Sequence, residues 1–266
     1  MNNVRSADAE ITYELEGKGA PVVLLHPFPV NHEFWQPVVQ ALNSRYQLVL
    51  LDLRGHGSSE IGEGPALMEK HAADIARVMD DAGVGRAAMV GVSIGGYALF
   101  EFWRRYRGRA AALILIDTKA TADTPEARNA RLQVANDVME RGTEAFIDGM
   151  LPRLMGETTR KTRPDLVETA RKMMLKMSPE DIGQVQRGMA ARPDSVETLK
   201  TINVPTLIVA GDEDTLTPIP DAELMRQHIG GSQLQVVPKA GHYSPFERPD
   251  ESGRMLRQFL DSVHGG

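Results

Sequence analysis

Cysteine is absent from this chain of 266 residues. Without thiols the protein can form no disulfide, no thiolate metal site and no cysteine nucleophile. Long apolar runs are missing as well, and none approaches the ~20 residues that a membrane-spanning helix needs. The first residues, MNNVRSADAEITYELEG, lack the apolar centre of a signal peptide. The absence of both kinds of apolar segment predicts a soluble, cytoplasmic protein.

An excess of positive charge is also missing, because 30 lysines and arginines stand against 36 acidic residues and the net charge is -6. Nucleic-acid-binding domains carry a basic footprint, and anionic membrane surfaces attract clusters of basic residues. The charge therefore argues against nucleic acid and membrane as partners. The length suits one large domain or a domain with an insertion, and it can bury a substantial core.

Short apolar runs such as PVVLLH and AALILID recur along the chain. They are nearly continuous in apolar residues, which is typical of strands buried on both faces of a parallel sheet. Helix-like segments separate them, so we predict an α/β fold with a doubly wound, mostly parallel sheet. Strands are expected at Pro21–His26, Tyr46–Leu53, Arg86–Val92, Ala111–Asp117, Pro205–Gly211 and Leu234–Pro238, with ITYELEG as an antiparallel edge strand. Helices are expected at about Phe34–Ser44, Ala66–Ala82, Ile94–Arg107, Ala222–Ile229 and Arg248–Val263.

The interval from Lys119 to about Thr201 shows helix starts but no strand. Thr124 precedes Pro125 as a helix N-cap would, and the sequence SPED predicts a capping box that starts at Ser178. We therefore predict a helical cap at residues 119–201, inserted between core residues 1–118 and 202–266. The alternative is that these helices pack on the sheet as ordinary crossovers. One helical face of the cap is expected to carry Leu166, Ala170, Met173 and Met177.

The stretch GVSIGG places Ser93 between glycines, after a predicted strand and before a predicted helix. This is the G-x-S-x-G pattern in the strand–turn–helix context that gives it meaning. Gly91 and Gly95 leave room for a sharp turn that pushes the serine hydroxyl out of the end of the sheet. The helix that begins at Ile94 presents free backbone N–H groups to whatever the serine attacks. We interpret Ser93 as a nucleophile rather than as a loop serine.

A serine hydroxyl is a poor nucleophile until a base takes its proton. His242 follows the last predicted strand, so it should lie at the carboxyl edge of the sheet, where ligands of open α/β sheets bind. A base also needs a partner that orients it. The sequence GDEDTLTP supplies Asp212, Glu213 and Asp214 at the same edge.

Acyl chemistry further needs N–H donors for an oxyanion, each commonly worth ~3 kcal/mol of transition-state stabilisation. One donor is expected from Ile94, the residue after the nucleophile. The loop HPFP should supply the second. Because Pro27 and Pro29 have no N–H, Phe28 is the natural donor.

With these parts in place, the chain resembles the α/β-hydrolase superfamily over nearly all of its length. The resemblance rests on LLHPFPVNHEFW, DLRGHGSS, GVSIGG, GDEDTLTP and AGHYSPFERP, in the family's order. The chain looks most similar to bacterial carboxylesterases, enol-lactonases and cofactor-free haloperoxidase or perhydrolase-type enzymes. Carried over by residue, the resemblance implies Ser93 as nucleophile, Asp214 as acid, His242 as base, and Phe28 and Ile94 as oxyanion donors.

Two details of the resemblance concern particular positions. The family's acid stands three residues after a strand-ending glycine and four before a proline, and Gly211 and Pro218 select Asp214 by that pattern. The family usually has His-Gly where this chain has His26-Pro27. The loop of the second donor is therefore expected to be stiffer here.

The expected activity is that of a serine hydrolase, a carboxylesterase or lactonase that works through an acyl-enzyme on Ser93. No cofactor or metal is expected, and the expected partner is a small-molecule ester or lactone. Serine rather than aspartate at the turn argues against dehalogenase and epoxide-hydrolase chemistry. Carbon–carbon bond hydrolysis and peracid formation use the same residues and stay open as alternatives. A small-molecule receptor on a hydrolase fold is the alternative from another class.

Other residues receive structural interpretations. His26 and His32 lack the third ligand that a metal site requires, and His26 is expected to tie loops together by hydrogen bonding. Asp117 ends a strand at the same edge of the sheet, where it either contacts substrate or caps the entrance to the insertion. Arg54 and His56 are expected to be mostly structural. The cap is rich in methionine, and a subset of these residues, with Trp35 and Phe28, is expected to line an adaptable apolar pocket.

Overall fold

The computed structural model describes residues 1–264 and is built around an eight-stranded sheet in the order β1-β2-β4-β3-β5-β6-β7-β8. The first two strands, β1 (Asn2–Ser6) and β2 (Ala9–Glu16), pair antiparallel, and β2 also runs antiparallel to β4. All other pairings are parallel. The parallel strands are β3 (Ala20–Leu25), β4 (Tyr46–Leu51), β5 (Ala87–Val92), β6 (Ala110–Ile116), β7 (Thr206–Gly211) and β8 (Gln233–Val237). The predicted fold class is confirmed.

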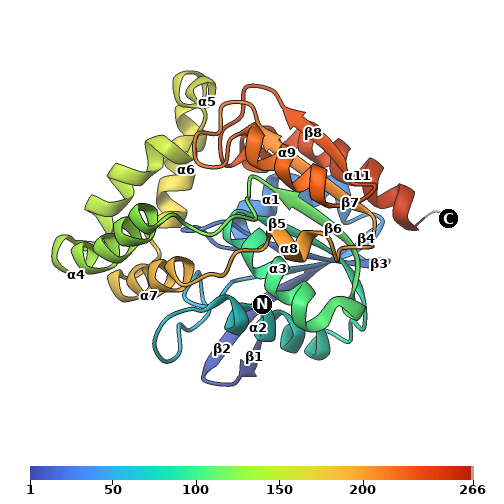
Figure 1. Ribbon diagram of the computed structural model, residues 1–266, viewed down its shortest axis with the longest axis horizontal. Helices are drawn as coiled ribbons and strands as arrows, with labels where there is room; N and C mark the ends of the chain where they lie inside the picture. Colours follow the sequence, from blue (N-terminus) through green and yellow to red (C-terminus); the bar gives the residue numbers. More distant parts are fainter. Residues whose placement is uncertain (265–266) are drawn as a thin grey trace.

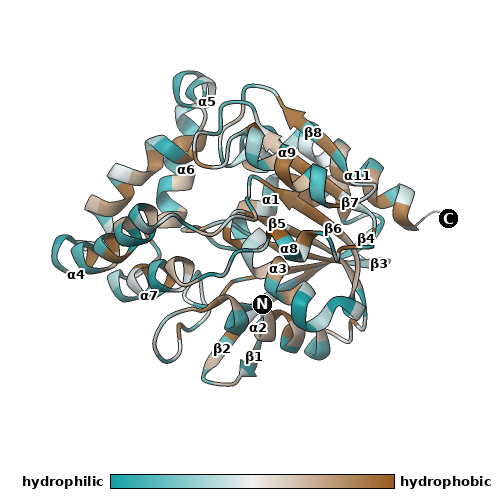
Figure 2. Ribbon diagram, in the orientation of Figure 1, coloured by the Kyte–Doolittle hydropathy of each residue, from teal (hydrophilic) through white to brown (hydrophobic). Residues whose placement is uncertain are grey.

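The sheet is covered on both faces, and its side chains alternate between two hydrophobic cores. In β3, Val23 and Leu25 belong to one core, while Val22 and Leu24 belong to the other. This alternation follows from the two-residue period of a strand. The first core contains apolar side chains of α2 (Met68–Asp81), α3 (Ile94–Tyr106) and α9 (Ile219–His228), and the second those of α1 (Gln36–Leu42) and α11 (Pro249–His264). Figure 2 shows the central strands in the brown of hydrophobic residues and more teal on the outer helices.

Between β6 and β7 the chain builds a run of helices that we call the helical insertion (residues 119–201). Its elements are α4 (Pro125–Leu154), α5 (Glu157–Thr162), α6 (Pro164–Met174), α7 (Pro179–Ala190) and α8 (Val196–Leu199). In Figure 1, α4, α6 and α7 gather at the left, beside the sheet rather than along its strands. Thr124 and Ser178 cap α4 and α7 as expected, and Ser178 forms the capping box with Asp181. Helix α4 is interrupted at Gly142, whose φ of 80° is not helical.

Several local predictions were wrong. ITYELEG is antiparallel but not at the edge, because β1 pairs with the outer side of β2. The strand β1 was not predicted because its sequence, NNVRS, is mostly polar and exposed. Helix α6 ends at Met174, so Met177 lies beyond the helix. Met177 packs in the first core, whereas Met173 packs in the second. The segment Phe34–Ser44 begins instead with a 3₁₀ turn, η1 (His32–Trp35), and α10 (Ser244–Glu247) was not anticipated.

No helix among residues 1–264 combines the length and the apolar character needed to cross a membrane.

Candidate active site

Ser93 stands on a strained turn between β5 and α3. Its φ of 53° and ψ of -112° fall outside the regions that residues with a side chain normally occupy. A Cβ atom added to Gly91 would lie 2.5 Å from the backbone carbon of Gly95, and one added to Gly95 would lie 2.7 Å from the carbonyl oxygen of Leu25. The two glycines are therefore required by close backbone contacts, as the sequence pattern predicts.

Ser93, His242 and Asp214 form a continuous hydrogen-bonded line. Nε2 of His242 lies 2.8 Å from Oγ of Ser93, and Nδ1 of His242 lies 2.8 Å from Oδ2 of Asp214. All three residues are buried. Because a carboxylate only accepts, Nδ1 carries the proton toward Asp214, which leaves Nε2 free to accept from the serine hydroxyl. The fold thus joins three residues that are far apart in the sequence.

The electrostatics of this line follow from burial and pairing. Burial acts to lower the pKa of His242, but the charge and hydrogen bond of Asp214 outweigh it, and the pKa of His242 is raised. Burial acts to raise the pKa of Asp214, but the charge and hydrogen bond of His242, with further hydrogen bonds, bring that pKa down to about 2. Asp214 is therefore ionised at neutral pH and stabilises positive charge on the imidazole.

The three carboxylates of GDED have different surroundings. Oδ1 of Asp214 accepts from the backbone N–H of Leu216 at 2.8 Å, so the Asp214 carboxylate is fixed against the loop that follows it in the chain. Asp212 is exposed and accepts from the backbone N–H of Lys239 at 2.6 Å. Glu213 accepts from the backbone N–H of Thr158 in the helical insertion at 2.8 Å. Among these three acids, Asp214 is the one that contacts His242.

The two expected oxyanion donors are placed by different elements. Ile94 is the first residue of α3, so its N–H has no partner within the helix. Phe28 lies in the loop between β3 and η1, which we call the Phe28 loop (residues 26–31). None of the hydrogen bonds found among residues 1–264 uses the N–H of Phe28, and this residue lines the same cavity as Ser93.

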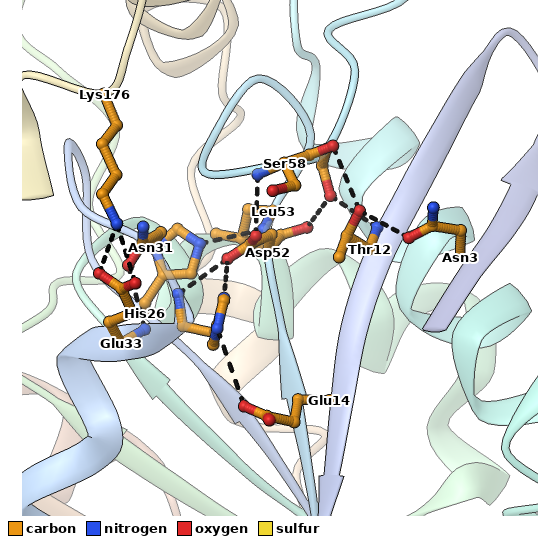
Figure 3. Close-up of polar contacts among 12 residues, drawn as sticks. Asn3, Thr12, Glu14, His26, Asn31, Glu33, Asp52, Leu53, Ser58 and Lys176 are labelled. Carbon is orange, nitrogen blue, oxygen red and sulfur yellow. Dashed lines mark hydrogen bonds and ion pairs between the residues drawn. The ribbon is translucent and has the colours of Figure 1, made fainter. Parts of the chain in front are cut away.

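The Phe28 loop is anchored by a buried polar network around Asp52 (Figure 3). Nε2 of His26 accepts from the N–H of Leu53 at 3.0 Å, and Nδ1 donates to the carbonyl of Pro27 at 2.9 Å. Oδ1 of Asp52 accepts from the backbone N–H and from Nδ1 of His32, at 2.8 and 2.7 Å. Burial lowers the pKa of His26 to about 3, so its ring is neutral. His26 ties the loops together, as expected.

Asp117 performs neither of the tasks expected from its position at the end of β6. The side chain of Asp117 is buried and does not line the cavity, and the backbone φ of this residue is 43°. Oδ1 accepts from the N–H of Gly211 at 2.8 Å and Oδ2 from the N–H of Ser244 at 3.1 Å. One carboxylate thus connects the end of β7, just before Asp214, to the residue two places after His242. Burial, and then the neighbouring charge of Asp214, raise its pKa.

Glu247 is a second buried acid with a bridging position, and sequence reasoning missed it. Its Oε1 accepts from the N–H of Gly241 and its Oε2 from the N–H of Gly156, both at 2.9 Å. It therefore ties the loop that carries His242 to the helical insertion. The only signal in the sequence was its place within AGHYSPFERP. Burial raises its pKa.

Ser93 and His242 open into a cavity of about 310 Å³ between the sheet and the helical insertion. Met150 and Met189 line it, whereas Met173 and Met177 are buried in the cores. Trp35 is buried and does not reach the cavity, contrary to expectation. Arg54 and His56 do not line it either. Its walls are formed by Phe28, Tyr97, Lys119, Asp123, Ala127, Ala130, Arg131, Val134, Phe146, Met150, Arg153, Leu154, Gln186, Met189, Leu216 and Thr217.

A model of the α/β hydrolase fold matches residues 20–249. The chain belongs to the α/β hydrolase fold family. Within residues 1–264 of this α/β hydrolase, no group of three or more histidine or acidic side chains is placed to hold a metal ion.

Known relatives of this α/β hydrolase include esterases and lactonases. A thermophilic esterase from Thermogutta terrifontis, solved with malate bound, is 36% identical and superposes with a TM-score of 0.96 over 99% of this chain and 100% of that one. The enol-lactonase from Burkholderia xenovorans LB400 is 25% identical, with a TM-score of 0.91 over 97% and 99%. The 3-oxoadipate enol-lactonase 1 of Acinetobacter baylyi is 28% identical over 91% of this chain and 89% of its own.

Proposed function

We propose that the protein is a serine hydrolase that cleaves a small carboxylic ester or lactone through an acyl-enzyme on Ser93. The observation that carries the proposal is the hydrogen-bonded line from Ser93 through His242 to Asp214. It ends at a cavity of about 310 Å³, near the lower end of the range of ligand pockets. Such a cavity suits a small substrate.

In the first half-reaction, Oγ of Ser93 attacks the substrate carbonyl while Nε2 of His242 takes the serine proton. The N–H groups of Phe28 and Ile94 hold the oxyanion that forms. His242 then gives its proton to the leaving alcohol oxygen, and the acyl group stays on Ser93.

In the second half-reaction, His242 takes a proton from water, which attacks the acyl carbonyl. The second tetrahedral intermediate collapses, and the proton returns to Oγ of Ser93. The acid product leaves, and the enzyme is restored without a cofactor. Throughout, the ionised carboxylate of Asp214 keeps the imidazole oriented and stabilises its charged form.

The relatives support ester chemistry rather than one particular substrate. One relative is named as an esterase and the other as an enol-lactonase, and both share the fold over nearly the whole chain. Carbon–carbon bond hydrolysis and peracid formation would use the same three side chains, and a receptor would need none of them in reactive form. Ester or lactone hydrolysis remains the proposal, and the experiment below separates it from the receptor.

A fluorophosphonate probe tests the nucleophile, and p-nitrophenyl esters of increasing chain length with a few lactones test the reaction. We expect rapid labelling confined to Ser93, and ester turnover that Ser93→Ala abolishes. The matched control is Ser58→Ala, because Ser58 is exposed and does not line the cavity. A folded protein that the probe does not label and that turns over none of these substrates would favour the receptor.

A further inference from the structure

The cavity beside Ser93 is rich in positive charge, although the chain as a whole has a net charge of -6. Its charged lining consists of Lys119, Arg131 and Arg153 against a single carboxylate, Asp123. The lining is therefore opposite in sign to the protein. A cavity lined by one sign of charge concentrates ligands of the other sign.

The one carboxylate in the lining is already neutralised. Asp123 forms ion pairs at 2.6 Å with both Arg131 and Arg192. Burial acts to raise the pKa of Asp123, but these two arginines outweigh it, so the pKa is lowered and the group stays charged. Arg192 also stacks over the ring of Tyr97 at 4.3 Å from its centroid. Asp123 is thus shared by two cations and cannot balance the remaining ones.

Lys119 and Arg153 have no such partner among residues 1–264. Neither side chain forms a hydrogen bond, and neither lies within 4.0 Å of a carboxylate in this part of the chain. The charge of Lys119 acts on Asp221, without an ion pair. Lys119 is half-buried and follows Asp117 by two residues, at the same edge of the sheet as Ser93, whereas Arg153 is exposed.

A half-buried ammonium group beside apolar walls loses part of its hydration, which costs free energy unless an anion replaces the lost water. Phe28, Val134 and Phe146 supply such walls in this cavity. We propose that the substrate carries a carboxylate at the end of its acyl chain, away from the reacting carbonyl, and that Lys119 is its main partner. Arg153, being exposed and screened by solvent, attracts the anion into the cavity. This inference rests on the proposed hydrolase function and narrows its substrate class.

The test compares two esters that differ in one charge. Mono-p-nitrophenyl glutarate carries a free carboxylate, and its methyl ester does not; both release p-nitrophenol. We expect wild-type kcat/KM to be higher for the anionic ester by roughly tenfold or more. A ratio of this size corresponds to the free energy of one charge-assisted hydrogen bond. Lys119→Met should remove most of the preference for the anionic ester, and Arg153→Gln should reduce that preference mainly at low salt.

The control is Arg128→Gln, which removes the same charge from α4 outside the cavity and should leave the ratio unchanged. A wild-type ratio near or below one overturns the inference, and so does a ratio that survives in the Lys119→Met, Arg153→Gln double variant. Because the ratio is measured first on wild-type protein, poor folding of a variant does not remove the test. The hydrolase proposal is upheld if wild-type protein turns over the methyl ester and Ser93→Ala abolishes that turnover, whatever the ratio between the two esters. If wild-type protein does not turn over the methyl ester, that result counts against the hydrolase proposal alone.

Discussion

The hydroxyl of Tyr243 donates a hydrogen bond to the backbone carbonyl of Phe28 over 3.0 Å. Tyr243 follows His242 directly in the chain, and Phe28 bears one of the N–H groups proposed to hold the oxyanion. The tyrosine is fully buried, with its ring against Phe34 at a centroid distance of 5.4 Å. The proposed base and the proposed oxyanion donor are therefore connected by one side chain.

Replacing Tyr243 by phenylalanine should loosen that connection. The ring would remain, but the buried carbonyl of Phe28 would lose its donor, at a cost of roughly 1–3 kcal/mol. We expect kcat to fall about tenfold with little change in KM, because the oxyanion forms only in the transition state. The control is Tyr13→Phe, which removes a hydroxyl bonded to Asp81 on another part of the sheet. An unchanged kcat in folded Tyr243→Phe protein would contradict the proposed role of the Phe28 loop.

The choice between two aspartates can be tested by the same substitution at each. Asp214→Asn keeps the shape but lets the imidazole adopt the wrong tautomer, a change that costs about 10⁴-fold in kcat in serine proteases. We expect a loss of several orders of magnitude. Asp212→Asn should lose no more than about tenfold, because within residues 1–264 this exposed side chain hydrogen-bonds only to the backbone of Lys239. Steady-state kinetics at matched thermal stability decides, and a larger loss for Asp212→Asn would show the assignment to be wrong.

The pH dependence of the reaction should report His242. Only the neutral imidazole can accept the serine proton, so kcat/KM should rise with pH as His242 loses its proton. Because Asp214 raises the pKa of His242 above its ordinary value of 6.5 despite burial, the midpoint of this rise should lie above pH 6.5. A profile of kcat/KM from about pH 5 to 9 measures it. A midpoint below 6.5 would mean that burial, which lowers the pKa, outweighs the carboxylate.

Two methionines of the helical insertion should behave differently. Met150 lines the cavity, so Met150→Ala should enlarge it and shift preference toward longer acyl chains on a panel of p-nitrophenyl esters. Met173 is buried in a core and does not line the cavity, so Met173→Ala should lower the free energy of unfolding by about 2–5 kcal/mol. The chain-length preference of the Met173→Ala variant should match that of the wild type. If Met150→Ala leaves the relative rates unchanged, this side chain of the helical insertion does not set acyl selectivity.

The sheet and its helices could be predicted from sequence because their signals are local. Continuous apolar runs such as β5 and β7 belong to strands buried on both faces, and the caps at Thr124 and Ser178 mark helix starts. The strand β1 could not be predicted in this way, since a short polar edge strand is stabilised by its pairing with β2 rather than by its own composition.

The turn at Ser93 was determined by the sequence itself, because the glycines that permit it stand within a few residues of the serine. What only the tertiary structure decided are the relationships between distant segments. His242 meets Ser93 across 149 positions, and the carboxylates of Asp117 and Glu247 bridge loops by accepting from backbone N–H groups, which leaves no pattern in the sequence. Lys119 lines the cavity with no hydrogen-bond or ion-pair partner for its side chain among residues 1–264. A local pattern reports what a segment can form with its neighbours in the chain. Which buried carboxylate pairs with which N–H, and which cation stays unpaired, depends on how the sheet edge and the helical insertion come together.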